Sequence, residues 1–299
     1  MFPSIRCHEL SVNYYTFTSN ISSCEGCAHL LAWRGMVLAV EQVRRMRGGA
    51  QAHLMRCSND GYYVVKFQNN PQGLRILANE LLGTRLAARL GLRVPEATVV
   101  EVRDELIAET EDMVIQHGRG RTPCRAGKQF GSRYPGKPAE TAVYDFLPDD
   151  ELRNLANLSD FLGVFVFDKW TCNTNGRQAI FLRERAAPAY SAQMIDHGFC
   201  FNAGEWSFPD APLRGLYARH RVYEAVRGMA SFEAWLARLE KITEMVLEEI
   251  YSEIPPEWYE FDSDEIERLL QHLLRRRRLV HDLIVSSWKS SAQPFPNWK

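Results

Sequence analysis

The middle of this chain constrains its fold more than any other segment. An apolar run at 160–170 has the composition of a buried helix and is followed by the polar turn 173–177. Two short apolar runs come next, 178–182 and 190–195, and the second leads into Asp196-His197-Gly198. Because short apolar runs bounded by turn residues are typical of buried strands, the segment predicts a helix, a polar turn and a strand pair.

A helix, a polar turn, two strands and then Asp-x-Gly is the layout of a kinase-type phosphoryl-transfer site. In such a site the turn supplies an acid that accepts the proton of the attacking hydroxyl, and the later Asp holds a metal ion against the phosphates of ATP. Asp196 suits the metal role, although a capped turn after a strand is another interpretation of Asp196-His197-Gly198. The turn has Asn175 where that chemistry needs an acid. The pattern therefore points to ATP and leaves open whether phosphate is transferred.

The composition narrows the class of protein. At 299 residues, 45% of them hydrophobic and 24% charged, the chain can bury a large core as one domain or as two lobes. A net charge of −1 gives no reason to expect a nucleic acid or a membrane surface as partner, and no apolar stretch approaches the roughly 18 residues of a transmembrane helix. Seven cysteines in a chain of this length do not form the pattern of a disulfide framework, and the single Cys-x-x-Cys, at 24–27, has no second pair nearby to complete a zinc site. We therefore expect a cytoplasmic protein with reduced thiols.

Residues 1–35 differ from the rest of the sequence. They have no sustained helical or strand period, and they lack the basic region and apolar core of a signal peptide. Regular patterning begins at Met36. We expect 1–35 to be a poorly ordered appendage, and an over-extended start with Met36 as the working initiator is a second hypothesis.

A lysine and a glutamate on neighbouring elements form the second candidate site. Lys66 lies in a β-rich run, where a solvated lysine facing outward is one interpretation. The next segment, 74–90, predicts a helix whose apolar stripe contains Glu80. Since a carboxylate on a buried face is costly unless a cation meets it, we expect Lys66 to pair with Glu80. Kinases use such a pair to orient the lysine at the α- and β-phosphates.

Gly48-Gly49 separates two strand-like runs ahead of Lys66. Glycines let backbone N–H groups approach a phosphate closely, so this pair is a candidate lid over a nucleotide. On this signal alone a plain hairpin turn is the favoured interpretation.

Taken in order, these motifs resemble those of the HipA-like kinase family, relatives of the bacterial HipA Ser/Thr kinases with a phosphatidylinositol-kinase-like fold. The resemblance covers roughly residues 36–285. It implies an α+β, two-lobed protein-kinase-like fold, with a small β-rich N-lobe at 36–136 and a larger helical C-lobe at 137–299. The sequences that carry it are Gly48-Gly49, Val65-Lys66-Phe67, Asn79-Glu80, Phe130-Gly131-Ser132-Arg133, Phe167-Asp168-Lys169-Trp170, Asn173-Thr174-Asn175-Gly176-Arg177 and Ile195-Asp196-His197-Gly198.

The resemblance also implies the ligands and the role of each residue. ATP and Mg²⁺ are the expected cofactors, with Lys66 at the phosphates, Glu80 orienting it and Asp196 on the metal. Gly48-Gly49 would cover the nucleotide. The adenine is expected near residues 130–136, which makes Ser132 and Arg133 candidate nucleotide contacts.

Two departures from the family pattern affect the predicted chemistry. The family has Asp at the position of Asn175 and a metal-binding Asn at the position of Ile180. Neither an amide nor an alkyl group can replace those functions directly, although Gln178 or Asn173 could lend an oxygen to the metal. Asp168 lies about two helical turns before Asn175 and is expected to be structural.

Three functions remain open on this evidence. The first is an enzyme that transfers the γ-phosphoryl group of ATP to a Ser/Thr hydroxyl, slowed because loss of a positioned base typically costs about 10²–10⁴-fold. The second is a pseudokinase that acts as a nucleotide-binding interaction module with a protein partner. A small-molecule kinase is the third and shares the same site.

The C-terminal third predicts a helical scaffold. Residues 231–250 and 263–288 each have the periodicity of an amphipathic helix. The basic run Arg275 to Arg278 within the second is expected to be a solvated face. Trp206, Phe208 and the run 212–217 occupy the place of an activation segment, where a substrate would dock.

Overall fold

Five strands close into a barrel in the order β1-β2-β3-β7-β4, in which β1 runs parallel to β4. The structure is a computed structural model that describes residues 36–138, 140–183 and 187–299. The predicted appendage 1–35 lies outside the described residues. Alternation along β3 buries Tyr63 and Val65 and turns Lys66 to the opposite face. The barrel strands are β1 (Met36–Arg45), β2 (His53–Cys57), β3 (Tyr62–Lys66), β4 (Ala97–Val102) and β7 (Gly127–Arg133).

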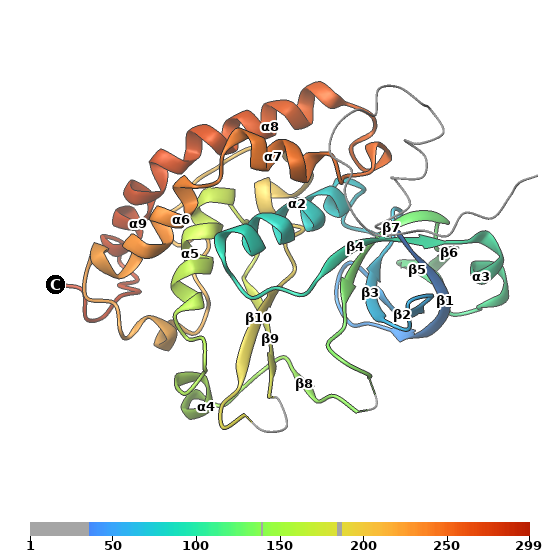
Figure 1. Ribbon diagram of the computed structural model, residues 1–299, viewed down its shortest axis with the longest axis horizontal. Coiled ribbons are helices and arrows are strands. Elements are labelled where there is room, and N and C mark those ends of the chain that lie inside the picture. Colours follow the sequence, from blue (N-terminus) through green and yellow to red (C-terminus); the bar gives the residue numbers. More distant parts are fainter. Residues whose placement is uncertain (1–35, 139, 184–186) are drawn as a thin grey trace, which may run out of the picture. The chain divides into compact units, whose positions relative to one another are not determined.

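Helix α2 (Arg75–Leu90) connects β3 to β4 and ends at Gly91, which has the left-handed backbone typical of a helix C-terminus. Most of its residues are buried, because it packs on β4 and β7 on one side and on the C-terminal helices on the other (Figure 1). The predicted helix at 74–90 is therefore confirmed. Its buried residues include the polar Asn79 and Glu80.

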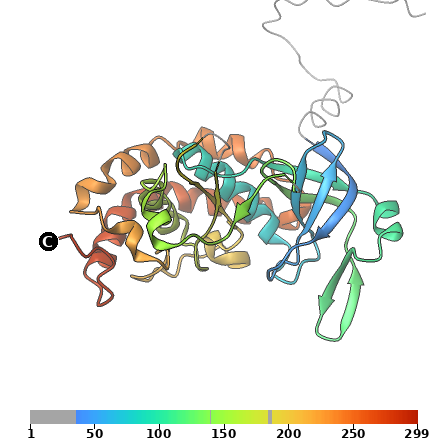
Figure 2. The ribbon, with the colours of Figure 1, turned by 90° about the horizontal axis from the view of Figure 1, so that it is seen from below.

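An excursion separates β4 from β7. It consists of α3 (Asp104–Glu109) and the hairpin of β5 (Val114–His117) and β6 (Gly120–Pro123). Figure 2 shows this hairpin projecting from the barrel.

The predicted helix, polar turn and strand pair are present. Helix α5 (Asp160–Thr171) is followed by the turn and by β9 (Gln178–Leu182) and β10 (Ser191–Ile195), which pair antiparallel. In their register Gln178 lies opposite Ile195, so the turn lies at the same end of the sheet as Asp196. The sheet is completed by β8 (Val143–Tyr144), and α4 (Asp149–Arg153) precedes α5.

The C-terminal third is helical, as expected, but neither segment predicted as one α-helix is continuous. Residues 263–288 divide into α8 and α9, with a short 3₁₀ helix between them. The segment 231–250 divides into α6 and α7, with Lys241 to Thr243 between them. Thr243 Oγ1 accepts a bond from the N–H of Val246 and so begins a new helix. The elements are α6 (Glu233–Glu240), α7 (Glu244–Tyr251), α8 (Ser263–Arg276) and α9 (Val280–Trp288), with short 3₁₀ helices at Cys200–Glu205, His220–Tyr223, Met229–Phe232, Pro256–Tyr259 and Arg277–Leu279.

The expected solvated face at Arg275 to Arg278 is also wrong in part. Arg276 is buried, with its guanidinium on the carboxylate of Asp210 and on the backbone carbonyls of Lys169 and Trp170. Those two carbonyls belong to the last turn of α5, which has no intrahelical donors for them. The arginine therefore caps the helix that leads into the polar turn.

Residues 36–299 form one compact unit with a sheet-rich N-terminal region and a helical C-terminal part. This is the α+β architecture that the resemblance implies, whereas the lobe boundary at 136 stays a prediction. Across the described residues, no helix is both long and apolar enough to span a membrane.

Helix α5 is buried along its whole length and packs closely on α6. At Gly163, an added Cβ would lie 2.6 Å from ring atoms of Trp235. Replacement by alanine gains about 1 kcal/mol of helix propensity. Because three ring atoms lie this close, overpacking is expected to cost about 2–3 kcal/mol, the upper part of its usual range. We expect Gly163→Ala to lower the free energy of unfolding by about 1–2 kcal/mol in urea titrations.

Gly228→Ala is the matched control, because nothing lies within 4 Å of its added Cβ and its backbone is extended. It should stay within about 0.5 kcal/mol of the wild type. A Gly163→Ala protein as stable as the control would contradict this packing.

Candidate active site

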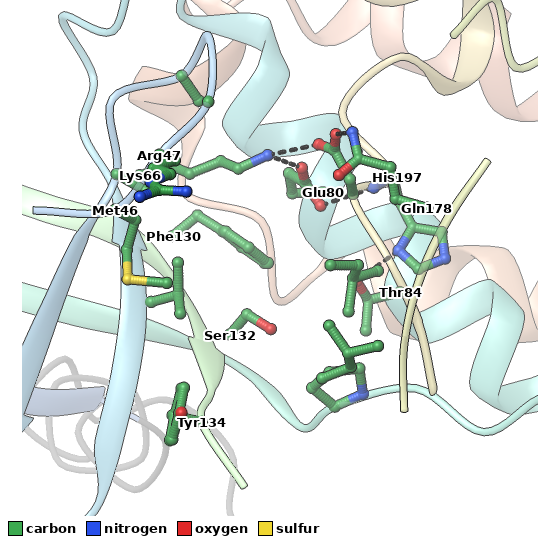
Figure 3. Close-up of a pocket in the computed structure, with 18 of the residues that line it drawn as sticks. Met46, Arg47, Lys66, Glu80, Thr84, Phe130, Ser132, Tyr134, Gln178 and His197 are labelled. Carbon is green, nitrogen blue, oxygen red and sulfur yellow. Dashed lines mark hydrogen bonds and ion pairs between the residues drawn. The ribbon is translucent and has the colours of Figure 1, made fainter. Parts of the chain in front are cut away.

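A cavity of about 310 Å³ lies between the barrel and the elements α2, β9 and β10. Its barrel side is formed by the β1–β2 turn, β3 and β7, and Figure 3 shows Lys66 reaching across it toward Glu80. All eight predicted site residues line this one cavity: Gly48, Gly49, Lys66, Glu80, Ser132, Arg133, Asn175 and Asp196. They come from six separate segments of the chain, so the fold brings together residues that are far apart in the sequence.

Lys66 is the centre of the charged network. Its ammonium forms an ion pair with Glu80 and donates to Asp196 Oδ1 at 2.7 Å. Burial disfavours the charge of Lys66, but the two carboxylates outweigh burial and raise the pKa of the ammonium above its usual value. The lysine is therefore protonated throughout the physiological range. The expected contact between Lys66 and Glu80 is present, and the role of Lys66 at a phosphate stays a prediction.

The two carboxylates differ in their surroundings. Burial raises the pKa of Glu80, against the opposing charge of Lys66. At Asp196 burial acts in the same direction, but Lys66 outweighs it and the pKa of this carboxyl is lowered. Glu80 Oε2 also accepts the backbone N–H of His197 at 2.9 Å. Helix α2 thus holds both the lysine and the backbone that follows Asp196.

A buried ion pair fixes the polar turn. Arg177 binds Asp168 with two nitrogens, both side chains are fully buried, and its Nη1 also donates to the carbonyl of Ile195 at 2.9 Å. Asn173 Nδ2 donates to the same Asp168 carboxylate. Asp168 is therefore structural, as expected, and the turn is anchored to both α5 and β10.

Asn175 lies at the mouth of the cavity and is exposed. Its Oδ1 accepts the N–H of Gly176 at 2.8 Å, and its own N–H donates to Asn173 Oδ1 at 3.1 Å. Asn175 stands at the position where the resemblance implies a base, and its amide is not ionisable. Two residues of β9, Gln178 and Ile180, line the same wall.

Sequence reasoning missed the role of Asn79, which precedes Glu80 on α2. Its Nδ2 donates to the carbonyls of Gly198, Cys200 and Ala203, at 2.9, 3.2 and 2.7 Å. Its Oδ1 accepts Trp206 Nε1–H at 2.8 Å. The sequence does show a polar residue inside the apolar run 76–82. Because buried amides are almost always hydrogen-bonded, Asn79 could have been predicted to bind other parts of the chain.

The segment held by Asn79 is strained. Phe201, Asn202 and Ala203 all have left-handed backbones, with φ of 60°, 60° and 57°. Such conformations persist only where surrounding contacts fix them. Trp206 is buried, and its hydrogen bond to Asn79 anchors this segment. Docking of a substrate at 212–217 stays a prediction.

The described residues contain no group of three or more His, Cys, Asp and Glu side chains arranged to hold a metal ion. Mg²⁺ in phosphoryl-transfer sites is commonly bound by one or two carboxylates together with substrate phosphates and waters. Asp196, with one carboxylate at the cavity wall, fits that kind of site.

A family model described as HipA-like kinase matches residues 39–282. The chain belongs to the HipA-like kinase family. No curated protein matches it.

Two solved structures share the fold of this HipA-like kinase. One is the Golgi casein kinase, at 14% identity and a TM-score of 0.52, over 85% of this chain and 74% of that one. The other is the proinflammatory kinase CtkA of Helicobacter pylori, at 14% identity and a TM-score of 0.52, over 86% of this chain and 98% of that one. At this identity the likeness shows a kinase-like fold.

Removing the Asn79 side chain tests its part in holding the strained segment. Asn79→Ala deletes four hydrogen bonds, each worth about 1 kcal/mol net. We expect the free energy of unfolding to fall by about 2–4 kcal/mol and amide hydrogen exchange across 198–206 to accelerate.

Asn154→Ala is the control, since Asn154 is exposed at the end of α4. Unchanged exchange at 198–206 in Asn79→Ala would show that other contacts hold the segment.

Proposed function

We propose that this chain binds ATP with a divalent cation in the cavity and transfers the γ-phosphoryl group to a Ser or Thr hydroxyl of a protein. One observation carries the proposal: Lys66 meets both Glu80 and Asp196 in a cavity that the Gly48-Gly49 turn also lines. Family membership supports a kinase in general. The nucleotide, the metal and the acceptor are part of the proposal.

In this proposal each residue acts by its charge and position. Lys66, held protonated by two carboxylates, binds the α- and β-phosphates, and Glu80 orients it. Asp196 holds the cation, which when bound neutralises charge on the phosphate oxygens. Gly48 has a left-handed backbone that suits a close approach of the turn to the phosphates. Ser132 and Arg133 contact the nucleotide from β7.

The transfer forms a bond between the acceptor oxygen and the γ-phosphorus and breaks the bond from that phosphorus to ADP. The hydroxyl proton needs an acceptor, and Asn175 provides none at neutral pH. Because catalysis of this reaction rests mostly on positioning and electrostatics, transfer continues with the proton lost to solvent. The rate is expected to be about 10²–10⁴-fold below that of a site with a base.

A second function is favoured by a different observation. Asn175 Oδ1 is already engaged by Gly176, and Ile180 places an alkyl group on the cavity wall. Both features suit a pseudokinase, which binds the nucleotide and acts as an interaction module. The two functions share ATP binding and differ in turnover.

Removal of the lysine charge tests the nucleotide site. We expect Lys66→Met to weaken ATP·Mg²⁺ binding at least tenfold in calorimetry, because the main cationic contact to the phosphates is lost. Lys241→Met is the matched control, since Lys241 is exposed between α6 and α7. A folded Lys66→Met protein, judged by its melting curve, that binds as the wild type does would refute the nucleotide site.

Restoring an acid separates the two functions. Asn175→Asp should raise phosphate transfer from [γ-³²P]ATP to a Ser/Thr protein acceptor by about 10²–10⁴-fold, since a positioned base returns. Asn154→Asp, an exposed change outside the cavity, should leave the rate unchanged. ATP binding without turnover in both the wild type and Asn175→Asp would establish the pseudokinase.

A further inference from the structure

One neutral side chain reaches the carboxylate of Asp196. Gln178 Nε2 donates to Asp196 Oδ2 at 2.6 Å, while Lys66 occupies Oδ1 at 2.7 Å. A glutamine amide carries an acceptor and a donor on the same planar group, and a half-turn of its last torsion exchanges them. The side chain that donates to a bare carboxylate can therefore present Oε1 to a cation beside that carboxylate.

The backbone fixes where this amide lies. Gln178 is opposite Ile195 in the β9–β10 register, directly beside Asp196. The preceding residue, Arg177, is anchored to the carbonyl of Ile195 and to the buried Asp168. The Cα of Gln178 is thus held at the end of the sheet, and its side chain lines the cavity (Figure 3).

The local charge favours a cation. One ammonium, on Lys66, stands against the two carboxylates of Glu80 and Asp196. Within this triad, ionisation of both carboxylates leaves one negative charge, and the neutral amide of Gln178 does not remove it. Arg177, which also acts on Asp196, is itself paired with Asp168.

The other amides near the turn are not free for this role. Asn173 is buried, with Nδ2 on Asp168 and Oδ1 on the N–H of Asn175. Asn175 Oδ1 accepts the N–H of Gly176. Ile180, one step further along the same face of β9, has no ligand atom.

We propose that Gln178 Oε1 is the second protein ligand, with Asp196, of the divalent cation that accompanies the nucleotide. This assignment rests on the proposed function and supplies the amide ligand that Ile180 lacks. Adjacent ligands of octahedral Mg²⁺ lie about 2.9 Å apart, from bonds of about 2.0–2.1 Å at right angles. The turned amide places Oε1 near the present site of Nε2, which lies 2.6 Å from Asp196 Oδ2.

The test measures how much a cation strengthens ATP binding. Calorimetric affinities for ATP in EDTA and in Mn²⁺ give a ratio that reports the metal contacts made by the protein. We expect Gln178→Leu to reduce this ratio at least tenfold and to leave the affinity in EDTA within twofold of wild type. Gln178→Glu, which keeps an oxygen and adds charge, should keep or increase the ratio. Gln193→Leu is the control, because Gln193 lies opposite Ile180 in the register and is not among the residues that line the cavity.

Each outcome of this experiment supports or overturns a stated part of the proposal. A full ratio in folded Gln178→Leu, or a ratio lost equally in Gln178→Glu, would overturn the assignment of Gln178. A wild-type protein that binds ATP in EDTA and gains nothing from Mn²⁺ would also overturn it, while ATP binding itself would stand. A wild type that binds ATP under neither condition would overturn the proposed function instead.

Discussion

The position of Lys66 between Glu80 and Asp196 is the interaction on which the cavity depends. It joins three elements that lie far apart in sequence, the barrel strand β3, helix α2 and the end of β10. Each of these charges is largely removed from water, and removal of one partner from a buried pair typically costs about 3–5 kcal/mol. The barrel, the helix and the strand pair therefore hold one relative placement, in which the phosphate-binding candidates face one another.

Helix α2 extends this constraint to the segment beyond Asp196. Glu80 accepts the N–H of His197, and the adjacent Asn79 binds three carbonyls and one indole N–H between Gly198 and Trp206. Two neighbouring residues of one helix thus fix the metal candidate and the strained backbone after it. A shift of α2 would break both sets of bonds together, so the charged network and the downstream segment form one mechanical unit.

Local patterns were enough to predict several elements of the fold and one contact of its site. Apolar periodicity located α2, α5 and the β9–β10 pair, and the cost of a buried Glu80 predicted its pairing with Lys66. What the sequence could not show depends on distant partners. Arg276 is buried because Asp210 and the end of α5 meet it, and the break between α6 and α7 follows a cap at Thr243. Helical periodicity continues across both positions, so it carries no sign of either contact.

The two departures from the family pattern act on different steps. Under the proposed function, Asn175 leaves the hydroxyl proton without a protein base, which affects the transfer itself, whereas Ile180 leaves the cation without one ligand, which affects how the nucleotide is held. Gln178 can offset the second loss because the β9–β10 register places it beside Asp196. No described side chain next to Asn175 replaces the missing base, since the carboxylate of the nearby Asp168 is buried against Arg177. Under the proposed function, the described residues therefore include more candidates for holding a metal and a nucleotide than for accepting a proton, and the test at Asn175 separates the two functions.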